Sequence, residues 1–279
     1  MKKQIFAIAE KCGISAVGIC GAERYRRESV SHPAVFASNK GTLLPDAESI
    51  IVCAFSYYNG ADRGNISRYA QGKDYHRVAI EKMNDIVNYL EENGYRAEAY
   101  ADTGGLNERM LASLCGIAFR GKNHMMINDS MGSYFFIGYI ITDCPLEPDS
   151  GKNRSCMDCG RCVKACPSGV LGKEPFDEKR CLSYITQRKG VLTPVEEKLI
   201  TDTGFIWGCD ICQEVCPHNK DIKVTGIDEF KQDLIIDLYI PEDMSNREFK
   251  TLYRDRAFAW RGKNVLVRNQ KIAESSKKI

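Results

Sequence analysis

The 279-residue sequence lacks the features of a membrane or secreted protein. No apolar run approaches the ~20 residues that a membrane-spanning helix requires. The first apolar run ends at Glu10 and Lys11, before the hydrophobic region of a signal peptide can form. We therefore expect a cytoplasmic protein with no membrane partner. A hydrophobic content of 43% is sufficient for a chain of this size to bury its own core.

The sequence also has little net charge, because its 39 basic and 37 acidic residues give a formal charge of only +2. The charge is nevertheless unevenly distributed. Residues 247–279 contain ten Lys or Arg residues against three acidic ones, so this segment has a charge of +7 and the remainder −5. Such a segment can contact nucleic-acid phosphates, although a solvated terminal helix would have the same composition.

Cysteine is too rare for a disulfide scaffold, since 13 in 279 residues is about 4.7%, below the roughly 8–10% of such proteins. Five of the cysteines are scattered through the first 150 residues, and we expect them to be small core residues: Cys12, Cys20, Cys53, Cys115 and Cys144. The other eight lie between residues 156 and 216. In a reducing compartment, clustered cysteines bind metals or carry out redox chemistry.

The clustered cysteines have the spacing of iron–sulfur ligands. A CxxCxxCxxxCP run like that of bacterial ferredoxins ends at Pro167, and its second half is repeated before Pro217. Because the CysPro cysteine ligates the other cluster in two-cluster ferredoxins, we predict two 4Fe-4S clusters. One is assigned to Cys156, Cys159, Cys162 and Cys216, and the other to Cys166, Cys181, Cys209 and Cys212. A pair of zinc sites is the alternative, but three-thiolate runs are not typical of zinc.

Hydrophobic periodicity predicts an α+β block before these cysteines. The expected helices cover residues 1–12, 74–92 and 106–115, and the expected strands cover 14–20, 49–58, 97–101, 124–127 and 134–142, with a polar segment between about 21 and 40. A turn-rich linker follows at 145–152. Short helices are expected between the cysteines, and two weak helix signals occur at 246–250 and 267–273. We thus predict three domains: residues 1–150, 151–225 and a short basic segment, 226–279.

Several ordered sequence blocks carry a family resemblance. They are RYAQGKDYH (68–76), ADTGGLNER (101–109), GKN (121–123), GSYFFIG (132–138), EPD (147–149), RCLSYITQ (180–187), GCDICQEVCPHN (208–219), and WRGK with RN between 260 and 269. In this order they resemble epoxyqueuosine reductases, the cobalamin-dependent iron–sulfur enzymes that complete queuosine in tRNA. Many members continue into a helical repeat domain, whereas this sequence stops about ten residues after the last block, as a short form would.

The resemblance implies a nitroreductase-like cobalamin-binding domain followed by a ferredoxin-like module. It implies reduction of epoxyqueuosine to queuosine in tRNA, with electrons passing through both clusters to cobalamin and Asp102 as proton donor. A carboxyl group that donates a proton near pH 7 needs a raised pKa, which burial against a corrin face would provide. From the residues alone, AspThrGly is more typical of a turn or a helix N-cap than of a proton donor.

Further contacts follow from the same resemblance. The implied cobalamin contacts are Ser67, Asp102, Asn123, Met126, Ile137, Ser183 and Asp210, and the implied substrate contacts are Arg68, Tyr75 and His76. The implied partners are a tRNA with epoxyqueuosine in its anticodon loop and an electron donor such as a flavodoxin or ferredoxin, with the enzyme acting as a monomer.

Two alternatives remain at the level of the sequence. A reductive dehalogenase-like reductase would use the same cofactors on another substrate. A ferredoxin-type electron-transfer protein would bind no corrin, and the cobalt content of the purified protein would distinguish it from both enzymes.

Overall fold

The structure, a computed structural model, describes residues 1–31, 45–151 and 154–275. Its contacts divide the chain into two compact units. Unit 1 consists of residues 1–56 and 75–157, and unit 2 of residues 57–74 and 158–279. The division into three domains, 1–150, 151–225 and 226–279, stays a prediction. Among the described residues, no helix combines the length and apolar character needed to cross a membrane.

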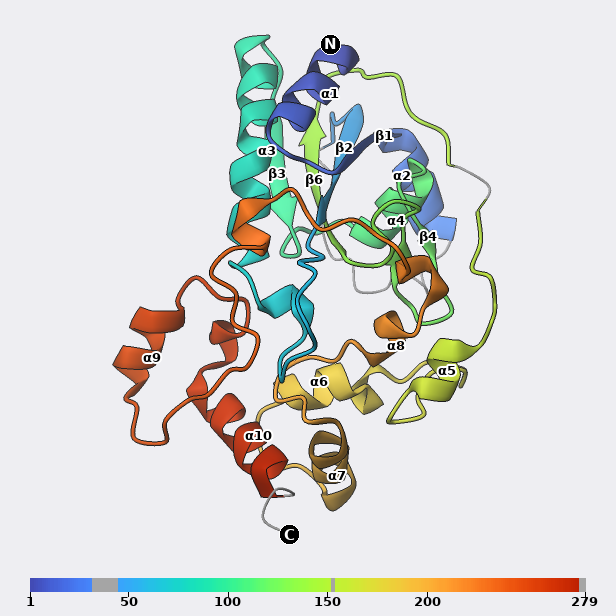
Figure 1. The fold of residues 1–279 in the computed structure, drawn as a ribbon. Helices are drawn as coiled ribbons and strands as arrows, with labels where there is room; N and C mark the ends of the chain where they lie inside the picture. Colours follow the sequence, from blue (N-terminus) through green and yellow to red (C-terminus); the bar gives the residue numbers. More distant parts are fainter. Residues whose placement is uncertain (32–44, 152–153, 276–279) are drawn as a thin grey trace. The chain divides into compact units, whose positions relative to one another are not determined.

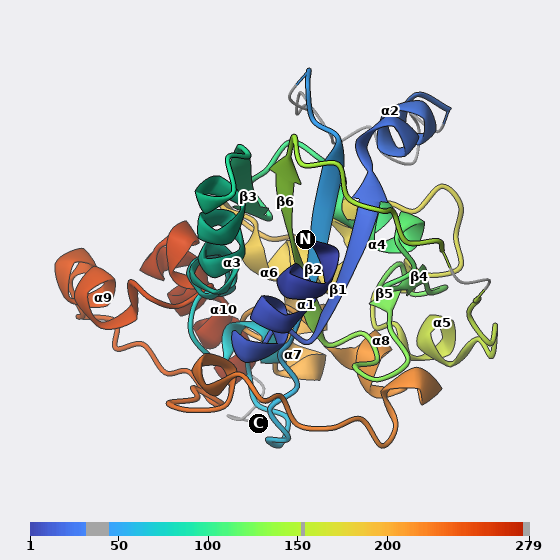
Figure 2. The same cartoon turned by 90° about the horizontal axis from the view of Figure 1, so that it is seen from above.

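Unit 1 contains a four-stranded antiparallel sheet with the strand order β1-β2-β6-β3 (Figures 1 and 2). Its strands are β1 (Ala16–Gly21), β2 (Ser49–Ser56), β3 (Ala97–Ala101) and β6 (Phe135–Thr142), and its helices are α1 (Lys2–Lys11), α2 (Ala22–Ser31), α3 (Tyr75–Glu92) and α4 (Glu108–Leu114). The short strands β4 (Phe119–Arg120) and β5 (Met126–Ile127) pair separately. The expected α+β character is confirmed.

Helices cover both faces of this sheet, which explains why all eight residues of β2 are buried. On one face, α3 approaches so closely that a Cβ at Gly138 would lie 2.8 Å from the Met83 Cε atom. On the other, a Cβ at Gly18 would lie 2.9 Å from the Cys115 Sγ atom, at the end of α4. Glycine at these two positions therefore lets the helices pack directly on the strands.

The described part of unit 2 contains helices and loops, and an isolated β-bridge joins Ile66 to Trp207. Its α-helices are α5 (Arg161–Ala165), α6 (Leu182–Gln187), α7 (Pro194–Thr203), α8 (Ile211–Glu214), α9 (Asn246–Tyr253) and α10 (Lys263–Ser275), and its short 3-10 helices are η1 (Arg68–Ala70), η2 (Glu178–Arg180), η3 (Pro217–Asn219), η4 (Asp228–Phe230) and η5 (Ala259–Arg261). Helices α6, α7 and α10 pack around Leu182, Ile200 and Phe205. The two weak C-terminal helix signals are confirmed as α9 and α10.

Residues 57–74 belong to unit 2, although they lie in the sequence between the two stretches that form unit 1. The chain leaves unit 1 after β2 and returns to it at α3. Within unit 2, the Ser67 N–H donates to the Trp207 carbonyl at 2.8 Å, and the Ile206 N–H donates to the Asn65 carbonyl at 2.7 Å. These backbone bonds attach residues 57–74 to the cysteine-containing region of the chain.

Candidate active site and cluster-binding region

Asp102 lies at the centre of a group of ionisable side chains in unit 1. It follows β3 directly and has a left-handed backbone, with φ +60°, which Asp tolerates better than most residues. Its N–H donates to the Glu108 Oε1 atom at 2.6 Å. Its Oδ2 atom lies 3.1 Å from the His76 Nε2 atom. The turn after β3 and the first residues of α3 and α4 therefore bring three titratable groups together.

Asp102 and Glu108 border a cavity of about 160 Å³. The cavity is lined by Tyr75, Asp102, Glu108, Arg109, Met125, Met126, Ser133, Phe135, Phe136 and Ile137. Tyr75 is held in place by stacking on Phe136, with ring centroids 4.1 Å apart, and on His76, at 4.0 Å. The lining is apolar along β5 and β6 and polar at the end near Asp102. Its volume is too small for a whole corrin, so it can contact only part of one.

The two carboxyl groups of this site have opposite pKa shifts. The hydrogen bond with His76 lowers the pKa of Asp102 below its usual value, assisted by Tyr75 and Arg109, although desolvation acts in the other direction. Desolvation raises the pKa of Glu108 to about 8, and the negative charge of Asp102 adds to this effect. Paired carboxyl groups whose environments separate their pKa values are typical of acid–base sites.

The protein atoms alone do not raise the pKa of Asp102, and the expected rise, which rests on burial against a corrin face, stays a prediction. Asp102 has 59% of its side chain exposed, so protein atoms desolvate it less than the expectation assumed. The imidazole of His76 favours the carboxylate form as well. The pKa that the protein atoms do raise is that of Glu108, which the sequence analysis did not select.

Several cysteines of unit 2 lie near one another. None of the thirteen cysteines, all of which are described, forms a disulfide. The side chains of Cys166, Cys181 and Cys212 pack against one cluster of buried residues around Cys162, Val170 and Leu171. Desolvation raises the pKa of Cys209 to about 12, and the nearby Asp210, Cys181 and Cys166 contribute to this rise. Four neighbouring sulfur atoms that disfavour each other's ionisation are a suitable environment for a cationic cluster.

Cys166 has a different environment from the other cysteines of this set. Backbone N–H groups of Leu171, Val170 and Ser168 and the Ser168 hydroxyl lower the pKa of Cys166, although desolvation opposes them. Hydrogen bonds to sulfur are one of the means by which proteins tune iron–sulfur clusters. The residues thus fit the predicted set Cys166, Cys181, Cys209 and Cys212. No preformed site for a single metal ion occurs in the described residues.

Three predicted cofactor contacts of unit 2 surround these cysteines. Asp210 follows Cys209, and Ser183 follows Cys181 by two residues. Asp210 is 2% exposed and accepts hydrogen bonds from the Ser67 hydroxyl at 2.6 Å, the Arg68 N–H at 2.7 Å and the Gln213 side chain at 3.1 Å. Burial raises the pKa of Asp210, whereas the hydrogen bonds from Ser67 and Arg68 lower it.

The predicted site residues fall into two groups. Tyr75, Asp102, Met126 and Ile137 line the cavity of unit 1, and His76 contacts Asp102. Asn123 is buried beside this group, and its side chain accepts the Met125 N–H. Ser67, Arg68, Ser183 and Asp210 belong to unit 2. Their roles as contacts stay predictions.

The sequence analysis did not select Glu108, Arg109, Ser133 or Phe136, although all four line the cavity. Each lies inside a sequence block that carried the resemblance, between residues 101 and 109 or 132 and 138. Their position in those blocks was the available signal.

Both regions of the chain match families of known proteins. Residues 38–103 match the family model described as "Epoxyqueuosine reductase QueG, DUF1730", and residues 155–219 match "4Fe-4S double cluster binding domain". An epoxyqueuosine reductase of Lactococcus garvieae is 38% identical over 245 residues, which cover 81% of this chain and 68% of the relative. One from Listeria monocytogenes is 33% identical and is covered to 79%, with 96% of this chain matched. The chain belongs to the epoxyqueuosine reductase family.

Solved structures of epoxyqueuosine reductases share the fold. The Streptococcus thermophilus enzyme has a TM-score of 0.85 and 31% identity over 100% of this chain and 82% of its own. An epoxyqueuosine reductase with an epoxyqueuosine-modified tRNA-Tyr stem loop has a TM-score of 0.84 and 29% identity, covering 99% and 81%. A reductive dehalogenase, at 13% identity and a TM-score of 0.53 over 98% of this chain and 36% of its own, shares the fold alone. The nitroreductase-like assignment stays a prediction.

Proposed function

We propose that this chain reduces epoxyqueuosine in tRNA to queuosine. The observation that carries the proposal is the cavity of unit 1, where Asp102, His76 and Glu108 meet beside an apolar wall. An epoxyqueuosine reductase of the same fold has been crystallised with an epoxyqueuosine-modified stem loop. We extend that substrate to this family member. A cytoplasmic, monomeric enzyme with a flavodoxin or ferredoxin as electron donor completes the proposal.

The reaction requires electrons and protons in equal number, because removing an epoxide oxygen as water consumes two of each. The eight cysteines between 156 and 216 would hold two 4Fe-4S clusters, in the two sets predicted above. Cobalamin, when bound, supplies a strongly reducing metal centre for cleavage of the carbon–oxygen bond. Its proposed contacts are Ser67, Asn123, Met126, Ile137, Ser183 and Asp210.

Asp102 is the proposed proton donor to the departing oxygen. Its exposed carboxyl group borders the cavity and can reach a bound ligand without crossing a layer of side chains. His76, at 3.1 Å, can return a proton to Asp102 after each transfer. Tyr75 and Arg68 are the other proposed substrate contacts. Bound substrate would desolvate Asp102 and raise its pKa, which favours the protonated form that a proton donor needs. His76 would supply that proton.

An Asp102→Asn variant tests this role. Asparagine tolerates the left-handed backbone as well as aspartate does, so the turn after β3 should keep its conformation. After anaerobic reconstitution with iron, sulfide and cobalamin, we expect normal metal content but at least a roughly 100-fold loss of epoxyqueuosine conversion. Nucleoside analysis of digested tRNA measures the product.

Asp233→Asn provides the matched control, because Asp233 is also exposed and also has a positive φ, of +49°, but does not line the cavity. Activity of Asp102→Asn close to that of Asp233→Asn would show that Asp102 is not the donor. Absence of conversion by the wild-type chain in the presence of both cofactors would contradict the proposed substrate.

A further inference from the structure

A second cavity lies in unit 2, and none of the predicted site residues lines it. It has a volume of about 390 Å³ and is lined by Lys189, Gly190, Asn246, Arg261, Gly262, Lys263, Asn264, Val265 and Arg268. Four of these nine residues are basic and none is acidic. The cavity is formed by the loop between α6 and α7, the start of α9 and the junction of η5 with α10. Its charge is therefore of a single sign.

None of the four basic side chains forms an ion pair within 4.0 Å among the described residues. Glu248 interacts electrostatically with Lys263, and Glu196 and Glu197 with Arg268, without such a close contact. Nearby acidic groups have other partners: Glu196 pairs with Arg188 at 2.7 Å, Glu242 with Lys271 at 2.7 Å, and Glu248 accepts the Ser245 N–H at 2.7 Å. The cavity thus keeps a net positive charge that an anion would compensate.

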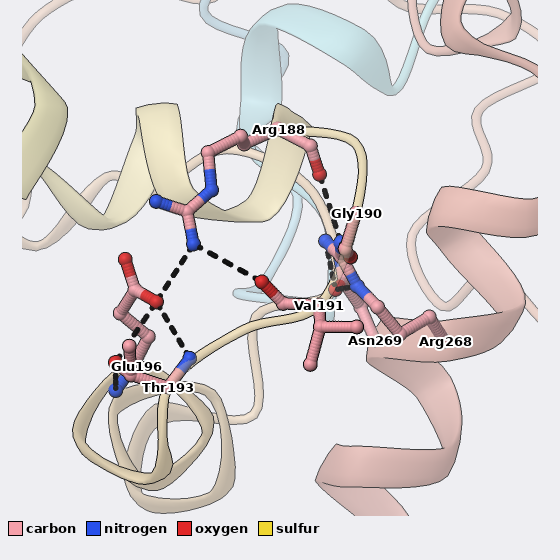
Figure 3. Close-up of polar contacts among 7 residues, drawn as sticks. All are labelled: Arg188, Gly190, Val191, Thr193, Glu196, Arg268 and Asn269. Carbon is pink, nitrogen blue, oxygen red and sulfur yellow. Dashed lines mark hydrogen bonds and ion pairs between the residues drawn. The ribbon is translucent and has the colours of Figure 1, made fainter.

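Neutral groups hold two of these cations in position. The Arg268 guanidinium donates to the carbonyl oxygens of Arg188 at 2.8 Å and Gly190 at 2.6 Å, and to the Asn269 side chain (Figure 3). Lys263 donates to the carbonyl oxygens of Glu242 and Met244. These contacts fix the surrounding loops without removing charge, so the site is organised before a ligand arrives.

The loop that carries Lys189 is fixed from its other side as well. Figure 3 shows the Arg188 side chain reaching Glu196, which also accepts the Thr193 N–H at 2.8 Å. Lys189 itself is exposed between these anchored neighbours. Its ammonium group is therefore available at the cavity while its backbone is restrained.

Arg261 shows the clearest unmet requirement for a ligand. Its Nε atom is shielded from solvent and has no hydrogen-bond partner among the described residues. A shielded donor without an acceptor is costly, and a phosphate oxygen would satisfy it. The first residues of α10, Lys263 to Val265, line the same cavity, and the N-terminal end of a 13-residue helix also favours an anion.

An aromatic side chain next to the cavity indicates which phosphate compound binds there. Trp260 is 63% exposed, and the Arg261 guanidinium lies 3.8 Å from its ring centroid. A large exposed aromatic ring beside an arginine is costly for a surface without a partner, but it is typical of proteins that stack on unpaired bases. A free phosphate would make no use of Trp260.

We propose that this cavity binds a backbone phosphate of the RNA substrate and that Trp260 stacks on a neighbouring unpaired base. The inference rests on the proposed function, because it takes the substrate to be tRNA. It assigns the contact to Lys189 and Arg261 as ligands, with Lys263 and Arg268 as the cations that shape the cavity. Three of these four residues, Arg261, Lys263 and Arg268, belong to the basic segment 226–279, which the structure describes up to residue 275.

Binding of a fluorescein-labelled, unmodified anticodon stem-loop RNA tests the proposal without requiring any chemistry. Fluorescence anisotropy is measured on the reconstituted full chain between about 50 and 200 mM KCl. For the double variant Lys189→Ala, Arg261→Ala we expect roughly tenfold weaker binding at 150 mM KCl and a slope of log Kd against log salt smaller by about 1 to 2. Trp260→Ala should weaken binding by about fivefold or more with an unchanged slope.

Two control variants separate this role from general effects. Lys198→Ala removes one positive charge from α7, where Lys198 pairs with Asp202 at 2.9 Å, and should bind RNA as the wild type does. Arg261→Lys keeps the charge and should retain most of the salt slope. Melting temperature and iron content establish that each variant is folded.

The proposal is overturned if the double variant binds RNA with the affinity and salt slope of Lys198→Ala. It is also overturned if inorganic pyrophosphate raises the melting temperature of the wild type but not of the double variant, while both bind RNA with the same Kd. The cavity would then bind a free phosphate ligand. Failure of the proposed function is recognised separately. A wild-type chain that binds RNA through this cavity but converts no epoxyqueuosine leaves the phosphate site intact and refutes only the reaction.

Discussion

Glu108 should control activity by holding the turn that carries Asp102. Its Oε1 atom accepts the Asp102 N–H at 2.6 Å, while Asp102 has φ +60°. A left-handed conformation costs a residue other than glycine on the order of 1 kcal/mol. A hydrogen bond of this kind contributes about 1 to 2 kcal/mol. The bond therefore offsets a backbone strain of similar size, and its loss should release the turn.

The comparison of Glu108→Ala with Glu108→Gln measures this contribution. Alanine removes the acceptor, and a loss of about 1 to 2 kcal/mol lowers the population of the productive turn by roughly 5- to 30-fold. Glutamine keeps an acceptor oxygen at nearly the same position and should retain activity within about threefold.

Single-turnover conversion of epoxyqueuosine in tRNA is the appropriate assay, since it reports the chemical step rather than product release. We expect Glu108→Ala to lower the rate constant with little effect on the Kd for tRNA. Equal activity of Glu108→Ala and wild type would refute the positioning role. Equal loss in Glu108→Ala and Glu108→Gln would show that the ionisable group, rather than the accepted hydrogen bond, is what Glu108 contributes.

Three further predictions concern stability and metal content. The pKa of Glu108 is raised to about 8 in the folded protein, so the free energy of unfolding should fall by on the order of a few kcal/mol as pH rises from about 4.5 to 8. Thermal denaturation of Glu108→Gln should show a smaller fall over the same pH range. Asp210→Ala should lower the free energy of unfolding by roughly 2 to 4 kcal/mol, because alanine leaves three buried donors without an acceptor. Asp210→Asn should lower it by less, and equal urea midpoints of the two variants would contradict this prediction. Cys212→Ser should reduce iron from about eight to about four atoms per chain, whereas Cys53→Ser, in β2, should leave it unchanged; equal iron in both would refute the cluster assignment.

Local patterns explain why much of the fold could be predicted from the sequence. The apolar spacing that predicted a helix at 74–92 produces α3, in which Val78, Met83 and Ile86 are buried. The alternation at 97–101 and the apolar run at 49–58 produce β3 and β2. Helix α2 was missed because its ten residues, AERYRRESVS, are mostly polar. Residues 21–40 were therefore expected only as a polar segment.

Contacts between distant residues could not be predicted in the same way. The segment 57–74 joins unit 2 through bonds such as Ser67 to Asp210, which are separated by 143 residues, and no local pattern encodes such a pairing. The same limit applies to the pKa of Asp102. His76 precedes Asp102 by 26 residues, and only the packing of α3 beside β3 brings the imidazole to the carboxylate. The contribution of His76 to the pKa of Asp102 could therefore not be predicted from the sequence.

Asp210 shows how a predicted cofactor contact and a structural role can coexist in one side chain. A carboxylate has about four acceptor positions, and Ser67, Arg68 and Gln213 occupy three of those of Asp210. At 2% exposure, the remaining position can be used only by a donor that enters the protein interior. A cofactor amide would satisfy that requirement, whereas a water-exposed substrate would not. If Asp210 contacts cobalamin, the bond must therefore come from an inserted side group, and Asp210→Asn, which retains an acceptor oxygen, should weaken cobalamin binding less than Asp210→Ala does.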